Sequence, residues 1–308
     1  MTTIKNVLVA TDLSPSSLNA IDRGFEISAS SNAQMTLTHC IGIDLFSGIR
    51  DLIGAKAEGI VTKAIEISRE KLETLASNPV RNRGISARIH VDSGLAFTVI
   101  SQQSELLDSN LLITGYKGEN EAYKFGLGTT SSRLLRKSHC PVLIVRNPCV
   151  GPYKSILIPV DFSQSSEMTI RLARKIAPQS HIVLMHVFDV PYESTLRLAG
   201  VSDDQVDRYR SAGVSNAYNQ LNALAAKCGL ERTSYRAVVE VGNASKLISD
   251  YAQMDKFELI VMGKHGTHVT EEMLLGSVTK HVLNSSQSDI LVVIDSRLPE
   301  PSFVDPPL

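Results

Sequence analysis

Apolar residues along the chain form two recurring patterns, short continuous runs and longer stretches with helical spacing. An apolar run covers 6–11, and Leu18, Ile21 and Phe25 follow it at intervals of three and four residues. The run is typical of a buried strand, and the spacing places its apolar side chains on one face of a helix. Ser14-Pro15 predicts the helix start, because serine caps helices and proline is tolerated in the first turn.

The rest of the first half continues this alternation of strand and helix. Further strands are predicted at 34–40, 85–91, 111–113 and 142–145, and further helices through 61–75, at about 95–108 and from about 128. In 85–91 apolar and polar residues alternate, which indicates a strand at a half-covered sheet edge. Five strands, four of them followed by helices, predict right-handed crossovers and a mostly parallel sheet with helices on both faces.

The second half of the chain repeats the first at a nearly constant offset. The segment 7–14 reappears at 156–163, 149 positions later, and Gly115, Gly118 and Gly128 reappear 148 positions later. Because chance similarity does not keep its spacing across separated landmarks, we infer an internal duplication. It predicts two tandem Rossmann-like α/β domains, each with a five-stranded sheet.

The duplication also sets the expected domain limits. We expect domains at 1–146 and 153–296, a short linker between them with two prolines and a glycine, and a Pro-rich tail at 297–308. In such sheets ligands bind at the carboxyl ends of the strands, where the strand order reverses. That reversal is expected between the first and fourth strands of each domain.

Composition narrows the classes of protein without identifying one. The 308 residues carry a formal net charge of −1, so no global field attracts nucleic acid or an anionic membrane. We see no export signal, and the apolar runs are too short to span a bilayer. Four scattered cysteines without a C-x-x-C pair favour reduced thiols. We therefore expect a cytoplasmic protein with no nucleic-acid or membrane partner.

The carboxyl ends of the first and fourth strands carry unusual residues in both copies. Asp12 follows the first strand and Gly115 follows the fourth, and Asp161 and Gly263 occupy the same places in the second copy. A carboxylate there can accept hydrogen bonds from ribose hydroxyls. The alternative is that Asp12 only caps the next helix or shapes the turn, which Ser14-Pro15 weakens by supplying a cap.

A glycine pattern, G-x2-G-x9-G-[S/T], follows the fourth strand in both copies. Glycines let the backbone approach a ligand, so successive amides can form an anion-binding nest. The last glycine opens a helix, whose first N–H groups favour phosphate. The alternative is that these glycines merely end a strand and permit a long loop. The first copy reads Gly115, Gly118, Gly128, Thr129 and Thr130, and the second reads Gly263, Lys264, His265, Gly266, Gly276, Ser277, Val278 and Thr279.

On these motifs, and on the segment 140–145, the sequence resembles a tandem universal stress protein. The resemblance covers almost the whole chain except the linker and the tail. It implies that Asp12 and Asp161 contact ribose, that Cys40 and Val187 lie beside adenine, and that the glycine loops with Thr129 and Ser277 hold the phosphates. Pro159 and Val160, directly before Asp161, belong to the same expected site.

The two copies are not equal. The second keeps Pro159 two positions before its aspartate, where the first has Ala10. The first copy also has a bulkier and more charged loop, with Tyr116, Lys117, Glu119, Glu121, Tyr123 and Lys124. Because acidic groups oppose phosphate, we rank the second site above the first.

The function that we expect is adenine-nucleotide binding in a stress response, with occupancy altering conformation or partner choice. ATP, ADP or AMP is the expected ligand, with Mg²⁺ as a plausible companion, and hydrolysis is expected to be slow at most. Alternatives are a true ATPase or self-phosphorylating kinase, a scaffold without nucleotide, and a flavoprotein. No P-loop motif is present.

Two further expectations concern histidines and assembly. His265 and His268 lack further ligands in sequence, so no metal site is predicted. His39 and His186 are interpreted as hydrogen-bonded core histidines rather than catalysts. The resemblance implies pairing through the last strands, which the two copies can make within one chain as a pseudo-two-fold pair, and two chains are then expected to form a homodimer.

Overall fold

The computed structural model describes residues 3–42, 57–118, 126–188, 198–266 and 275–294. Within them, ten strands form one sheet in the order β3-β2-β1-β4-β5-β10-β9-β6-β7-β8. The first repeat contributes β1 (Asn6–Thr11), β2 (Gln34–Gly42), β3 (Ala87–Gly94), β4 (Leu111–Gly115) and β5 (Val142–Val145). The second contributes β6 (Ser155–Pro159), β7 (His181–Phe188), β8 (Tyr235–Val241), β9 (Leu259–Gly263) and β10 (Asp289–Val293).

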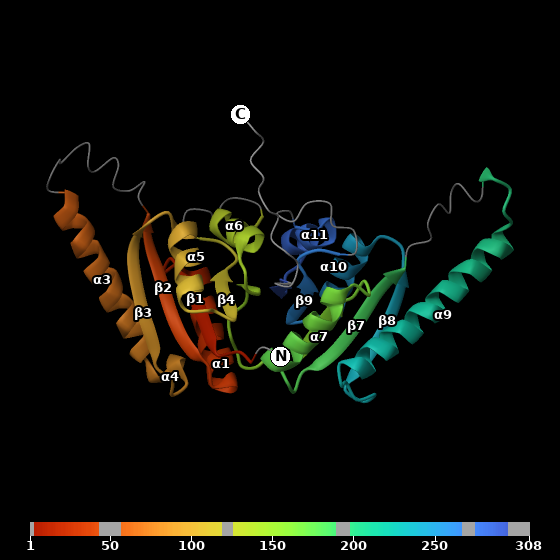
Figure 1. Ribbon diagram of the computed structural model, residues 1–308, viewed down its shortest axis with the longest axis horizontal. Coiled ribbons are helices and arrows are strands. Elements are labelled where there is room, and N and C mark those ends of the chain that lie inside the picture. The colour runs from red at the N-terminus through yellow and green to blue at the C-terminus, as the bar shows by residue number, and fades with distance from the viewer. Residues whose placement is uncertain (1–2, 43–56, 119–125, 189–197, 267–274, 295–308) are drawn as a thin grey trace, which may run out of the picture.

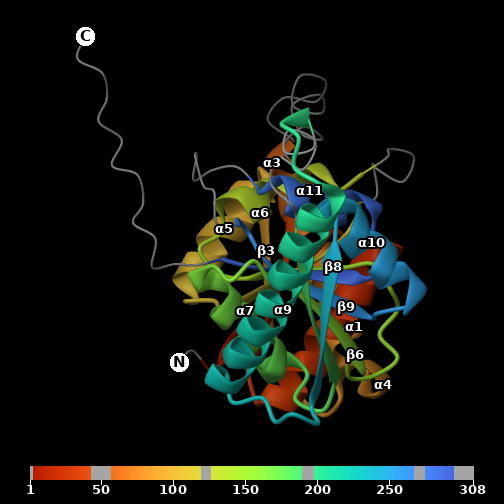
Figure 2. The ribbon, with the colours of Figure 1, turned by 90° about the vertical axis from the view of Figure 1, so that its right-hand side faces the viewer.

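Helices cover both faces of this sheet. Those of the first repeat are α1 (Pro15–Ser31), α3 (Ala57–Ser77), α4 (Pro79–Asn82), α5 (Ala96–Leu106) and α6 (Thr129–Lys137). Those of the second are α7 (Gln164–Ile176), α9 (Asp203–Lys227), α10 (Ala244–Met254) and α11 (Ser277–Ser285). Figure 1 shows the two repeats side by side, and Figure 2 shows α9 lying along β8 at the outer end of the sheet.

Each strand directs alternate side chains into two separate core layers. Val7 and Val9 of β1 pack in a layer with α1, α3, α7 and α9, whereas Leu8 and Ala10 pack in the opposite layer with α5, α6, α10 and α11. This division follows from the two-residue repeat of side-chain direction in a strand. Both layers contain residues of both repeats, so the core is continuous across the molecule.

The strand order confirms the predicted fold and its reversal point. β1 pairs in parallel with β2 on one side and with β4 on the other, and β6 does the same with β7 and β9. The expected half-covered edge strand is β3, although it runs from Ala87 to Gly94 rather than over 85–91. Ile85 instead closes a turn by donating to the carbonyl of Asn82.

The two repeats join through their last strands. β5 and β10 pair antiparallel, with Leu143 opposite Leu291, and form the seam between the repeats. Moving outward from this seam, the strands of the first repeat follow the same order as the equivalent strands of the second. The intrachain pseudo-two-fold pairing expected from the sequence is therefore present. The homodimer stays a prediction.

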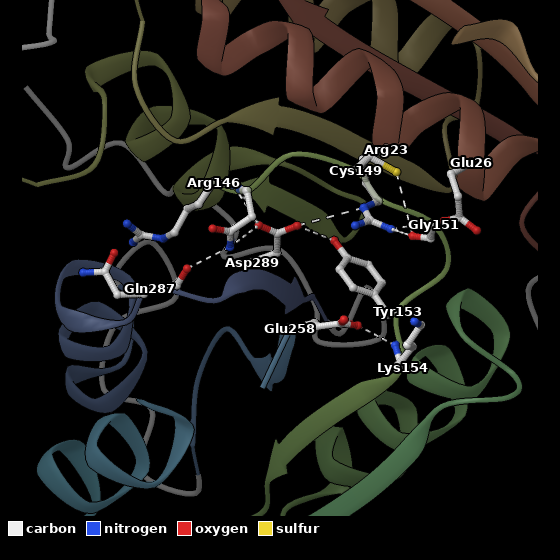
Figure 3. A network of polar contacts seen from close by, with 11 residues as sticks. Arg23, Glu26, Arg146, Cys149, Gly151, Tyr153, Lys154, Glu258, Gln287 and Asp289 are labelled. Atoms are coloured by element: carbon white, nitrogen blue, oxygen red, sulfur yellow. Dashed lines mark hydrogen bonds and ion pairs between the residues drawn. The ribbon is translucent and has the colours of Figure 1, made fainter. Parts of the chain in front are cut away.

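A buried polar network fixes the linker against the seam (Figure 3). Tyr153 donates a 2.7 Å hydrogen bond to Asp289 Oδ2, and the backbone N–H groups of Arg146 and Asn147 donate to Asp289 Oδ1 at 2.8 and 3.1 Å. The Arg23 guanidinium lies 3.7 Å from the centre of the Tyr153 ring and donates to the Gly151 carbonyl. The linker is thus held by α1 and β10 together.

Two further observations bear on the class of protein. In the described part of the chain, no helix is long and apolar enough to cross a membrane. All four cysteines are free thiols.

Candidate functional site

The aspartates and the glycine loops meet at the carboxyl edge of the sheet, as the sequence predicted. Because β1 and β4 are neighbours, Asp12 lies beside the loop that leaves Gly115. A Cβ added to Gly118 would lie 2.8 Å from Asp12 Oδ2, and one added to Gly266 would lie 2.9 Å from Asp161 Oδ2. Only glycine lets the loop approach the carboxylate this closely.

The two oxygens of each aspartate have different surroundings. Asp12 Oδ1 accepts the N–H of Ser14 at 3.0 Å. Asp161 Oδ1 accepts the N–H of Ser163 at 3.0 Å and the hydroxyls of Ser163 and Ser166 at 2.6 and 2.9 Å. The turn-shaping role considered as the alternative is therefore real, but it uses Oδ1. Oδ2 faces the glycine loop.

The residue after each aspartate has a left-handed backbone. Leu13 has φ 65° and Phe162 has φ 61°, although neither is glycine. Such conformations cost roughly 1–3 kcal/mol and persist where the surroundings hold them. The Leu13 N–H donates to Thr11 Oγ1, and the Phe162 ring packs on His186. This backbone conformation could not be predicted from the sequence, because the two side chains differ and neither favours positive φ.

The glycine loop returns to the strand end through a backbone hydrogen bond in each repeat. The N–H of Gly128 donates to the carbonyl of Tyr116, and the N–H of Gly276 donates to that of Lys264, both at 3.0 Å. A Cβ on Gly115 would lie 3.1 Å from the backbone of Ser16, so this glycine also permits close packing of β4 on α1. The loop-forming alternative accounts for part of the glycine pattern.

The helices that follow begin without a side-chain cap. Gly128 is the N-cap of α6 and Gly276 is the N-cap of α11, and neither makes a side-chain cap hydrogen bond. Ser14 is the N-cap of α1, as predicted, and its side chain accepts the N–H of Ser17, whereas the N-cap Ser163 of α7 makes no side-chain cap hydrogen bond. An uncapped helix start with glycine before it is suited to an anion.

These features surround a cavity of about 210 Å³ in the first repeat. Its lining includes Lys117, next to Gly118, and the apolar Ala96 and Ile100 of α5. All seven candidate residues of the first site line it, namely Asp12, Cys40, Gly115, Gly118, Gly128, Thr129 and Thr130. The candidate residues therefore come together at one cavity from four separate segments of the chain.

Cys40 is held as a neutral thiol in this cavity. Its S–H donates to the Gly94 carbonyl, with 3.4 Å between sulfur and oxygen. Burial, with a smaller contribution from Asp92, raises the pKa of the thiol from 9.0 to about 11. A protonated thiol is a weak nucleophile, so Cys40 lines the cavity as a small apolar group.

The strand-end histidines are hydrogen-bonded, as predicted. His39 Nδ1 lies 2.8 Å from the carbonyl oxygen of Thr11, and His186 Nδ1 lies 2.8 Å from that of Val160. A carbonyl accepts from Nδ1–H, so each ring links neighbouring strands near the aspartate.

Several second-site candidates contact other parts of the protein. The Thr279 hydroxyl donates to the Gly263 carbonyl at 2.9 Å, as Ser131 does to Gly115 at 3.0 Å, so both hold a helix start against a strand end. The Lys264 ammonium donates to the carbonyl of Arg136 in the first repeat. Thr279 and Lys264 thus engage protein acceptors.

The apolar second-site candidates belong to the core layers. Val160 is buried, and its N–H donates to the Met185 carbonyl. Val187 and Val278 are partly buried against the layer of α10 and α11. Pro159 ends β6 opposite Met185. Gly276 approaches the backbone of His265, so the two ends of the second glycine loop are close together.

The predicted advantage of the second site stays a prediction. Residues 267–274, including His268, lie outside the described residues, and so do Glu119, Glu121, Tyr123 and Lys124 of the first loop. Among the residues that are described, no group of three or more His, Cys, Asp or Glu side chains is arranged to hold a metal ion.

Comparison with known proteins agrees with the duplication. The profile of the universal stress protein family matches residues 3–146 and 152–293. A universal stress protein of Methanocaldococcus jannaschii is 28% identical over 155 residues, which is 46% of this chain and 94% of that protein. One of Mycobacterium tuberculosis is 25% identical over 250 residues, 77% of this chain and 76% of that protein.

A solved structure shares the whole arrangement. The crystal structure of a universal stress protein from Archaeoglobus fulgidus superposes with a TM-score of 0.65 at 19% identity, over 95% of this chain and 99% of that one. At this identity the likeness concerns the fold. Together with the two profile matches, it shows that the chain belongs to the universal stress protein family and contains the family's domain twice.

Proposed function

We propose that this chain binds an adenine nucleotide, ATP or one of its relatives, at the carboxyl edge of the sheet in each repeat. Occupancy would change conformation or the choice of protein partner, as a regulatory module of a stress response. The observation that supports this most strongly is the cavity of about 210 Å³, because all seven residues expected at the first site line it.

The proposed roles follow from the chemistry of each group. Asp12 Oδ2 and Asp161 Oδ2 accept hydrogen bonds from ribose hydroxyls, because Oδ1 of each is engaged by the turn. The glycine loops and the starts of α6 and α11 hold the phosphates through backbone N–H groups. Thr129 and Ser277 add hydroxyl donors at those starts. Cys40, neutral and small, lies against the base.

Lys117 gives the first site a cation at the phosphate side of the cavity. It offsets part of the negative charge that a nucleoside polyphosphate brings, alongside the dipole of α6. A Mg²⁺ ion accompanying the phosphates would supply further charge neutralisation. These groups bind and orient the ligand.

Hydrolysis is proposed to be slow at most. His39 and His186 bond to backbone carbonyls through Nδ1, and the Cys40 thiol is neutral at physiological pH. A general base must reach the proton that it removes and titrate near the working pH. The Cys40 thiol, with its pKa raised to about 11, fails the second requirement, and Nδ1 of His39 and of His186 is already engaged by a carbonyl.

The direct test is to heat-denature the purified chain and identify released nucleotide by chromatography, then titrate nucleotide-free protein with ATP by calorimetry. We expect an adenine nucleotide in the extract, or measurable binding by the stripped protein. An extract without nucleotide together with no heat of binding for ATP, ADP or AMP would refute the proposal. Turnover near 1 per second or above, the low end for ordinary enzymes, would favour the ATPase alternative.

A further inference from the structure

A lysine in the second glycine loop contacts the helix of the first site. Lys264 lies between Gly263 and Gly266, and its side chain crosses the seam to donate to the carbonyl of Arg136. Arg136 lies in the last turn of α6, a helix of nine residues that begins at Thr129 in the first site. Lys264 is only 8% exposed, so this contact is shielded from water. One end of α6 therefore belongs to the first site and the other end holds a residue of the second.

The reverse connection runs from the first glycine loop to the helix of the second site. Tyr116 occupies the position equivalent to Lys264, 148 residues earlier. The Arg146 guanidinium lies 3.4 Å from the centre of the Tyr116 ring, and Nη2 of the same arginine donates to the carbonyl of Leu283. Leu283 lies in the last turn of α11, which begins at Ser277 in the second site.

The two connections are alike in their electrostatics. Each places a cation, the ammonium of Lys264 or the guanidinium of Arg146, against the carbonyls at the carboxyl end of a helix. That end carries the negative part of the helix dipole, and the amino end of the same helix carries the positive part that favours phosphate. The carboxyl end of α6 is thus held by Lys264, which belongs to the second glycine loop. The carboxyl end of α11 is held by Arg146, which stacks on Tyr116 of the first glycine loop.

A third contact crosses the seam. A Cβ added to Gly126, just before the N-cap of α6, would lie 3.3 Å from Oδ1 of Asn284 in α11. The end of the first glycine loop therefore packs on the helix of the second site. Figure 1 shows α6 and α11 on the two sides of the seam.

From these reciprocal contacts we propose that the two nucleotide sites are positively coupled, so that occupancy of one raises the affinity of the other. The inference rests on the nucleotide binding proposed above. A phosphate at the start of α6 fixes that helix and the first glycine loop, which in turn fixes the acceptor of Lys264 and the ring under Arg146. Lys264 of the second site is then held before the second ligand arrives, so the second binding event costs less conformational entropy.

The test uses ATP as the probe and calorimetry on the full chain. Gly118→Val and Gly266→Val each place a side chain against the carboxylate of one site and leave the other site open. The two one-site variants give the intrinsic affinities. In the wild-type chain we expect the second ATP to bind at least about 5-fold more tightly than those affinities predict for independent sites, the lower limit of typical allosteric coupling.

Lys264→Met, introduced into the wild-type chain and into both one-site variants, is expected to reduce this factor to below about 2-fold. The matched control is Lys154→Met, which removes an exposed lysine at the start of β6, at the amino edge of the sheet, and should leave the factor unchanged. If Lys264→Met does not unfold cooperatively, Tyr116→Leu breaks the other connection and is judged by the same comparison.

The outcomes separate the two proposals. A wild-type isotherm equal to the sum of the one-site isotherms, or coupling that survives both Lys264→Met and Tyr116→Leu, would overturn the coupling and leave nucleotide binding intact. Absence of ATP binding by every variant and by the wild-type chain would overturn both.

Discussion

Tyr153, directly after the linker, donates its hydroxyl proton to Oδ2 of Asp289, the first residue of β10, across 2.7 Å in the interior. Asp289 also accepts the N–H groups of Arg146 and Asn147, which directly follow β5. The Asp289 carboxylate, in the last strand of the second repeat, thus accepts hydrogen bonds from Arg146 and Asn147 after β5 of the first repeat and from Tyr153 after the linker. The seam is therefore a permanent part of the fold rather than a loose contact between two domains.

Asp289→Ala should destabilise the chain strongly. It leaves the Tyr153 hydroxyl and the N–H groups of Arg146 and Asn147 without their acceptor, and we expect a loss of about 3–5 kcal/mol in the free energy of unfolding. Tyr153→Phe removes one of these hydrogen bonds and should cost about 1.5–3 kcal/mol. Urea unfolding followed by circular dichroism measures both. Equal losses for the two variants would contradict the central position of Asp289.

Much of the fold follows from local patterns in the sequence. The apolar runs predicted the strands, and the repeated glycines predicted the two candidate sites at the carboxyl edge, because both patterns depend on neighbouring residues. The short helix α4 was not foreseen. It is a single turn started by Pro79 with Asn78 as its cap, and it has no buried face to leave a periodic signal.

The direction of Lys264 and the partners of Asp289 were beyond prediction from the sequence for a different reason. The sequence placed Lys264 beside the phosphates because it lies inside the glycine motif. Its side chain instead reaches a carbonyl 128 positions earlier in the chain, a contact that exists only after β5 and β10 have paired. Asp289 likewise opens an apolar strand and gives no sign of its partners in the linker.

The reactivity of Cys40 should depend on pH in a characteristic way. Because burial raises the thiol pKa to about 11, the rate of alkylation by iodoacetamide should keep rising between pH 9 and 11. The unfolded chain ionises near 9.0 and the folded chain only near 11, so this group favours the folded state below pH 9 and that contribution is lost as pH rises to 11. Peptide mapping by mass spectrometry isolates Cys40 from the other thiols. A plateau in its rate by pH 9 would contradict the raised pKa.

Gly118→Ala should weaken nucleotide binding at the first site. The new Cβ would lie 2.8 Å from Asp12 Oδ2, so the carboxylate must move away from the position that faces the ligand. We expect about a tenfold loss of affinity, equivalent to about 1.4 kcal/mol. The matched control is Gly59→Ala in α3, where an added Cβ meets nothing within 4 Å. Calorimetry with ATP compares the two, and unchanged first-site affinity in Gly118→Ala would argue against the proposed site.

Lys256→Gly should stabilise the chain although it removes a side chain. Lys256 follows α10 with φ +52°, a left-handed conformation that glycine adopts without strain. We expect a gain of up to about 1 kcal/mol, since the left-handed penalty for other residues is roughly 1–2 kcal/mol. Lys71→Gly, in the exposed interior of α3, is the matched control and should instead lose about 1 kcal/mol. Thermal unfolding measures the change in stability of both variants. A loss of stability in Lys256→Gly would show that the contacts of the lysine side chain outweigh the strain of its backbone.

The two oxygens of Asp161 allow turn formation and ligand binding to be separated by substitution. Asp161→Asn keeps an oxygen that can accept from the N–H of Ser163 and from the hydroxyl of Ser166, so the turn should survive with a change in stability under about 1 kcal/mol. The side chain loses its charge on the face opposite Gly266, however, and hydrogen bonds to a charged acceptor are worth roughly 1.5–3 kcal/mol. We therefore expect at least about tenfold weaker nucleotide binding at the second site, measured in the Gly118→Val background, with an almost unchanged melting temperature. Asp161→Ala, which removes the acceptor for the turn as well, should lower both affinity and melting temperature. If Asp161→Asn lowers the melting temperature as much as Asp161→Ala while affinity stays constant, the carboxylate serves the turn and not the ribose.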